Sequence, residues 1–202
     1  MGLISNGTTI FDNGSMASGF GGNLNFISKA TASASASIEF TSGIDSTYKE
    51  YVFYFVNMHP ATDGATFQFN MSTDSGSNYN VTKSTSYFYA RHIENDTDTG
   101  LSYSTSDDLA QSTAFQNISH GTNGIGNDND QSGSGYLHLF NPSSTTFVKH
   151  YISRFQEYNL NDYSLDSYSG GYGNTTSAVD AIKFQMDSGN IDSGEILLFG
   201  VN

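Results

Sequence analysis

The sequence predicts an all-β fold: an antiparallel β-sandwich, jelly-roll-like, preceded by an extended N-terminal arm. Apolar and polar side chains alternate in many short runs, and turn residues recur between the runs. Aromatic residues make up 14% of the chain, which is enough to fill the space between two sheets. We count eight or nine strands and no convincing long helix, and two long connections favour a Greek-key arrangement of jelly-roll type.

The N-terminal segment, residues 1–25, is rich in Gly and Asn and has few apolar residues. The candidate anchoring residues are Leu3, Ile4, Ile10 and Phe11. A segment with so few anchors buries little surface by itself. It is therefore either an arm that docks these side chains on another surface or a frayed end with a short first strand. The predicted division is an anchoring arm at 1–25 and a β-sandwich domain at 26–202.

The first strands follow the arm directly. In TASASASIEF, residues 31–40, small or apolar side chains alternate with Ser and Glu, so one face is dry and one is wet. YKEYVFYFVNMH, residues 48–59, is apolar on both faces, as expected for a strand that is covered on both sides or touches a partner. Pro60 cannot donate a hydrogen bond and should end this strand. PATDG and the alternating ATFQFNMS that follows it predict a hairpin.

The rest of the chain repeats this pattern after a polar interruption. Further strand-like runs occur at 81–93, 136–140, 145–156, 180–187 and 194–201. Residues 94–135 are polar and irregular, and only 107–115 could hold a short helical turn. Residues 159–178 are rich in Tyr, Ser and Gly and are interpreted as a connection. The last run is nearly all apolar, so we expect that strand to be central and buried.

The charge balance narrows the range of partners. Seven Lys and Arg against 20 Asp and Glu give a net charge of −13, so nucleic acid and anionic membrane surfaces are not expected partners. No run of 18 apolar residues predicts a membrane span, and the N-terminus does not match a signal peptide. Charged residues are only 13% of the chain, about half the usual share, which is unlike a cytosolic metabolic enzyme.

The search for catalytic motifs predicts a protein that is not an enzyme and needs no cofactor. There is no Cys, no G-x-S-x-G turn and no H-E-x-x-H pair, and the five His show no metal-ligand spacing. A sandwich hydrolase with paired Glu residues remains a third hypothesis.

The stretch GNDNDQSGSG, residues 126–135, resembles the start of a calcium-binding loop. Asp128 and Asp130 take the first and third positions, with Ser and Gly at the fifth and sixth. The twelfth position, which requires a bidentate Glu, is Leu139. The stretch is therefore a weak calcium candidate, and a solvated turn is the preferred interpretation.

A glycan-binding site is the stronger alternative. The segment YNLNDYSLDSYSGGYGN mixes Tyr with Asn, Asp and Ser, and aromatic rings stack on sugars while amides bind hydroxyl groups. The candidate contact residues are Tyr158, Tyr163, Tyr168 and Tyr172. The alternative is a Tyr-rich loop that packs on its own sheet or contacts a neighbouring subunit.

Several stretches together resemble a known group of proteins. These are GIDSTYKEYVFYFVNMHPATD, FQFNMSTDSGSNYN, DDLAQSTAF, GIGNDNDQSGSGYLHLFNPSSTTFVKHYIS and GYGNTTSAVDAIKFQMDSGNIDSGEILLFG. They resemble virion structural proteins of marine tailed phages, cyanophages in particular. The resemblance implies a particle component at the virion surface, either a capsid-associated decoration or a tail-fibre-type protein, with capsid or tail proteins as partners. By analogy we expect a homo-oligomer, a homotrimer for example. The alternative function is a receptor-recognition module that binds a host surface glycan.

Overall fold

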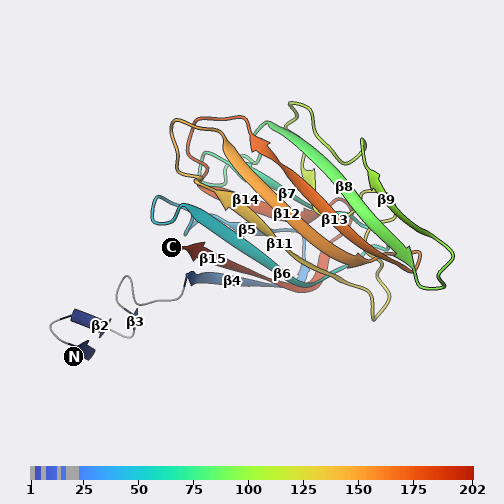
Figure 1. The fold of residues 1–202 in the computed structure, drawn as a ribbon, viewed down its shortest axis with the longest axis horizontal. Helices are drawn as coiled ribbons and strands as arrows, with labels where there is room; N and C mark the ends of the chain where they lie inside the picture. Colours follow the sequence, from blue (N-terminus) through green and yellow to red (C-terminus); the bar gives the residue numbers. More distant parts are fainter. Residues whose placement is uncertain (1–2, 6–7, 13–14, 17–22) are drawn as a thin grey trace.

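A computed structural model describes residues 3–5, 8–12, 15–16 and 23–202. All regular structure in these ranges is β, and none of these residues forms a helix that is long and apolar enough to cross a membrane. Two antiparallel sheets of eight and four strands pack face to face, as Figure 1 shows. The predicted β-sandwich is therefore confirmed.

The large sheet contains eight strands. In spatial order they are β4 (Leu24–Ser35), β15 (Ile191–Val201), β6 (Glu50–Pro60), β11 (Gly133–Phe140), β12 (Lys149–Tyr158), β13 (Tyr163–Gly173), β8 (Lys83–Ile93) and β9 (Thr99–Tyr103). The strands of the small sheet are β10 (Gln116–Asn117), β7 (Phe67–Ser72), β14 (Ala181–Met186) and β5 (Ile38–Phe40). A third, separate sheet joins β1 (Leu3–Ser5), β2 (Thr8–Asp12) and β3 (Ser15–Met16).

The sandwich has jelly-roll topology. Its core strands in chain order are β4, β5, β6, β7, β10, β11, β14 and β15. If these eight strands are numbered 1 to 8 along the chain, four of them lie side by side in the large sheet in the order 1, 8, 3, 6. The other four lie side by side in the small sheet in the order 2, 7, 4, 5. This is the strand order of two interleaved Greek keys. The other strands come from two insertions, β8–β9 after β7 and β12–β13 after β11, and these extend one side of the large sheet.

One predicted connection is instead a strand. Residues 159–178 contain β13, which pairs along its whole length with both β12 and β8. The pattern was hidden because small polar residues, Ser167 and Ser169, occupy the buried positions where apolar residues are expected. The helical turn at 107–115 does not form.

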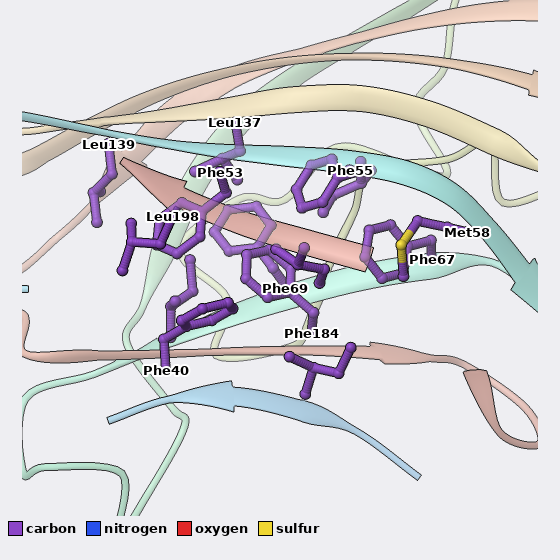
Figure 2. Close-up of a cluster of buried hydrophobic side chains, with 14 of the residues drawn as sticks. Phe40, Phe53, Phe55, Met58, Phe67, Phe69, Leu137, Leu139, Phe184 and Leu198 are labelled. Carbon is purple, nitrogen blue, oxygen red and sulfur yellow. The ribbon is translucent and has the colours of Figure 1, made fainter. Parts of the chain in front are cut away.

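Aromatic side chains fill the space between the sheets. Figure 2 shows Phe53 and Phe55 from β6 facing Phe67 and Phe69 from β7, with Phe184 of β14 among them. All five are at most 2% exposed, and Phe55 meets both Phe67 and Phe184 edge to face, with ring centroids 5.2 Å apart in each pair. Burying one such ring contributes about 1.5–3 kcal/mol. This cluster is the main apolar core of the fold.

A long loop closes the inner face where the small sheet ends. The backbone of residues 104–112 runs beside the edge of β8, where the Ser104 amide donates to Tyr87 and the Lys83 amide to Ser112. Beyond β10, the chain crosses the inner face of the added strands, and Ser119 and His120 become buried there. Because a buried loop must satisfy its own backbone, this part of the core is polar.

Candidate functional site

The outer face of the large sheet, which is the face turned away from the small sheet, collects most of the exposed apolar surface. Nine large hydrophobic side chains are exposed among the described residues, and seven of them lie on this face. The seven are Leu24, Phe26, Val56, Phe88, Leu101, Tyr103 and Ile152. The other two are Ile4 in β1 and Phe147 in the β11–β12 loop. Nothing in the described part of the chain covers the seven, so this face is a candidate contact surface.

Because no other described residues pack on the outer face of the large sheet, β15 is buried only on the side that faces the core. Leu198 points to the core and is fully buried, whereas Phe199 on the outer face is half-buried. The strand is interior to the sheet, as expected, but the prediction that it is buried holds only for its core-facing side chains. Its continuous apolar run reflects a core face and an apolar outer face.

One row of side chains crosses all eight strands of the outer face. Direct register partners, strand by strand, are Lys29, Leu197, Tyr54, Tyr136, Arg154, Tyr168, Phe88 and Tyr103. Phe88 and Tyr168 stack with their ring centroids 4.7 Å apart, and the Arg154 guanidinium lies 5.2 Å from the Tyr168 ring centroid. Because β13 lies between β8 and β12, Phe88 and Arg154 lie on opposite faces of the Tyr168 ring.

The cations of this row are already paired. Lys29 Nζ lies 2.6 Å from Glu195, and Arg154 Nη2 lies 2.6 Å from Asp166. The hydrogen bond to Asp166 raises the pKa of the Arg154 guanidinium above its usual value. The outer face therefore presents apolar side chains and neutralised charges in a chain that is otherwise strongly acidic.

A second candidate, which we call the rim cleft, opens where the long loop meets the added strands. It has a volume of about 190 Å³. Its lining residues are Tyr89 and Arg91 of β8, Tyr163 and Leu165 of β13, His120, Thr122 and Asn123 of the loop, and Asn159. Four separate segments of the chain thus meet in one small concave surface.

The single cation of the cleft lining is held by a carboxylate. Arg91 Nε donates to Asp98 at 2.7 Å, and the Tyr163 hydroxyl donates to the same carboxylate at 3.1 Å. The hydrogen bond from Arg91 lowers the pKa of Asp98 below its usual value. Arg91 therefore brings little net charge to the cleft.

The loop side of the cleft is fixed by close packing. The His120 ring meets the Tyr89 ring edge to face at 4.1 Å, and its Nδ1 lies 3.0 Å from the Thr122 amide, which can donate to it. A Cβ on Gly124 would lie 2.5 Å from the Ala65 carbonyl oxygen, so only glycine fits there. The residue before it, Asn123, has a φ of 59°, a left-handed conformation that Asn tolerates better than most residues.

A buried acid supports the loop from below. Glu157 of β12 is fully buried and accepts a hydrogen bond from the His120 amide at 3.2 Å. Burial raises the pKa of Glu157 well above its usual value. Its Oε2 and the hydroxyls of Ser153 and Ser167 have no partner among the described residues. The sequence analysis missed this cluster, although Glu157 shares its strand parity with Tyr151 and Phe155, which would have placed it inward.

The structure separates the four tyrosines predicted for glycan contact. Tyr163 lines the rim cleft, whereas Tyr168 and Tyr172 lie on the outer face. The Tyr158 hydroxyl donates to Asp162 at the β12–β13 turn. The four therefore do not form one site, and Tyr163 is the one that lines the rim cleft.

The calcium candidate lies in an exposed loop. The turn at Asp128 is closed by Gln131, whose Oε1 accepts from the Asp128 amide at 3.1 Å and whose Nε2 donates to the Asn159 carbonyl at 3.0 Å. The Asp128 and Asp130 side chains are exposed. Within the described ranges, no three His, Cys, Asp or Glu residues form a group that could hold a metal ion.

The predicted anchor falls mostly outside the described side chains. Ile4 is 60% exposed, and the side chains of Leu3, Ile10 and Phe11 lie outside the described residues. The backbone pairs Leu3 with Phe11 across β1 and β2.

Comparisons with family models, with curated proteins and with solved structures found no match for this chain.

Proposed function

We propose that this chain is a non-enzymatic structural protein of a virion, a surface decoration or tail-fibre-type component, and that its copies associate through the outer face into a homo-oligomer. The observation that carries the proposal is the gathering of seven exposed apolar side chains on one face of a jelly roll. Exposed apolar groups on one face, such as Leu24 with Phe26 and Leu101 with Tyr103, favour an interaction surface.

The charge distribution supports a second copy of the same chain as the occupant of this face. Two chains of net charge −13 repel each other unless they meet where the local charge is low. The outer face meets that condition because Lys29 and Arg154 are each paired with a carboxylate. Closed rotational symmetry then lets every copy use the same surface, and a homotrimer is proposed by analogy with other particle attachments.

The architecture and the sequence resemblance favour a particle as the setting. Jelly rolls recur in viral coats and in lectins, where the sandwich serves as a rigid display unit. That argument is by analogy of fold, and the resemblance to phage virion proteins adds to it. The N-terminal segment, with its own small sheet, would connect the sandwich to a capsid or tail protein.

Antibody labelling of purified phage particles tests this function. An antibody raised against residues 23–202 should label intact particles at regularly repeated positions under the electron microscope. Mass spectrometry of the same particles should detect the chain at a fixed ratio to the major capsid protein. Pre-immune serum is the control.

Two results would contradict the proposal. The chain would be found in the soluble fraction of an infected-cell lysate and be absent from the particles, or the purified protein would turn over a substrate. Either result would remove the structural role.

A further inference from the structure

We infer that the rim cleft binds one ring of an uncharged glycan. This site lies at the end of the inner face, away from the outer face proposed for assembly, and the inference does not depend on that assembly. If the chain is displayed on a particle, the glycan would belong to a host surface.

The size of the cleft sets the size of the ligand. A volume of about 190 Å³ is below the roughly 300–1,000 Å³ of sites that enclose drug-sized molecules. A single sugar ring can enter, and the remaining rings of an oligosaccharide would lie outside over the exposed Thr122 and Asn123.

The electrostatics disfavour an anionic ligand. Arg91 is occupied by Asp98, and the Tyr163 hydroxyl donates to the same carboxylate. No other Lys or Arg lines the cleft in the described part of the chain. The whole chain carries −13, which repels sulfated or sialylated glycans at a distance.

The hydrogen-bonding groups match hydroxyls. The Asn159 side chain uses its Oδ1 to accept from the amides of Asn161 and Tyr163, which leaves its Nδ2 without a partner among the described residues. The side chains of Asn123 and Thr122 likewise make no hydrogen bond within that set. Amide and hydroxyl groups that both donate and accept suit the vicinal hydroxyls of a neutral sugar.

The aromatic walls supply the apolar contact that a sugar ring requires. Tyr89 and Tyr163 enter from two different strands, and Leu165 adds an aliphatic surface between them. The outer-face tyrosine Tyr168 cannot serve in this way, because both faces of its ring are occupied.

The cleft is preorganised, which reduces the entropy lost on binding. The carbonyl of Tyr163 accepts from the Asn159 amide at 3.0 Å, so these two lining residues are tied together. The Gly124 backbone, tied to Leu160 by a hydrogen bond, fixes the position of Asn123. Free and bound protein should therefore differ little in this region.

A glycan array with neutral and sialylated glycans, followed by NMR titration, tests the inference. The titrated probes are the methyl glycosides of glucose, galactose, mannose and N-acetylglucosamine. We expect saturable binding to at least one, with a Kd near the millimolar range that one ring can supply. Tyr163→Ala and Asn123→Gly should each weaken binding about tenfold or more, which is at least ~1.4 kcal/mol. The Gly variant keeps the left-handed backbone at position 123.

Tyr172→Ala is the matched control, because Tyr172 lies on β13 but on the outer face. It should leave the affinity unchanged. Absence of binding to every neutral glycan would overturn the inference, as would a preference for sialylated glycans. Binding that survives both cleft variants and is lost in Tyr168→Ala would move the site to the outer face and equally overturn it. None of these results depends on whether particles contain the chain.

Discussion

At the scale of single residues, two buried ionisable groups respond to pH in opposite directions. Lys83 is fully buried, and its Nζ donates to Asn70 Oδ1 and to the Val81 carbonyl. Burial lowers the pKa of Lys83 from 10.5 to about 7. Between these values the unfolded chain holds more protons, so Lys83 makes the fold more stable as pH rises from 7 towards 10.5. Glu157, whose pKa is raised by burial, acts in the opposite sense above pH 4.5.

Replacing Glu157 by Gln should increase the free energy of unfolding at pH 8 by about 1–3 kcal/mol, with little change at pH 4. Below pH 4.5 the carboxyl is neutral in both states, whereas above it the unfolded chain gains the charge before the folded chain does, which favours unfolding. Denaturant unfolding at the two pH values measures the effect.

The control is Glu195→Gln, because the pKa of exposed Glu195 is lowered by its hydrogen bond to Lys29. It should show no gain at pH 8. If Glu157→Gln increased the free energy of unfolding equally at both pH values, the explanation would be contradicted. The gain would then come from better packing of the amide and not from removal of the ionisable group.

In β12, the alternation of side chains along the strand indicates which residues point into the core better than their charge does. In KHYISRFQEY the inward positions include Lys149, Tyr151, Phe155 and Glu157, and all four are buried. Charge alone argues that the Lys and the Glu face water. The alternation was strong enough to decide the question, but burial of these charges depends on a loop from elsewhere in the chain, which local sequence does not specify.

At the scale of elements, the large sheet differs from an ordinary sandwich sheet because its outer face is apolar and uncovered. The sequence of β6 is apolar on both faces, and the predicted alternatives were a covered strand or a strand that touches a partner. Within the described residues no second layer covers this face of the strand, and contact with a partner stays a prediction. Strand β13 could not be recognised, because Ser and Gly at its buried positions give no hydrophobic period. β13 forms as a strand because it pairs with β12 on one side and with β8 on the other.

An Ile152→Lys variant should dissociate the oligomer to monomers while leaving the fold intact. Ile152 is 53% exposed at the middle of the outer face, and a new cation there must lose its water when a second copy docks. The change in stability should stay within about 0.5 kcal/mol, as is usual at a surface position. Sedimentation velocity across a concentration series measures the assembly.

Phe147→Lys is the matched control, because Phe147 is 68% exposed but lies off the outer face, in the β11–β12 loop. This variant should remain oligomeric. If the two variants behave alike, the outer face is not the contact surface.

At the scale of the whole molecule, the β-sandwich was predictable because most of its strands carry clear alternation and turns. The full strand order was not, because β10 is a two-residue strand within 94–135, which the sequence predicts to be irregular, and 31–40 contains the end of β4 and the whole of β5. The two inserted hairpins were not, since nothing in a local pattern tells whether a strand belongs to the core or extends an edge. The rim cleft was equally hidden. It joins loop residues near 120 to strand residues near 90 and 163, and only the tertiary fold brings these together. Of the residues predicted for glycan contact, Tyr163 alone lines the rim cleft.

Deletion of residues 1–22 should give a folded sandwich that no longer joins particles. β4 begins at Leu24, so the deletion leaves both sheets of the jelly roll complete. The melting temperature should change by no more than a few degrees. Co-sedimentation of the purified proteins with particles that lack the chain measures attachment, and the full chain is the positive control. Attachment of the shortened protein would show that the N-terminal segment is not the anchor.

The first and last strands of the sandwich are neighbours, and their free ends coincide. Leu24 and Val201 are register partners, and the Asn202 amide donates to the Asn23 carbonyl at 3.0 Å. Tension applied between these two ends would open the β4–β15 ladder one rung at a time, like a zipper, which needs little force. If the protein is attached only through its N-terminal side, no force acts across the hydrogen bonds between β4 and β15. If a second protein also pulled on the C-terminal side, that force would separate the two strands.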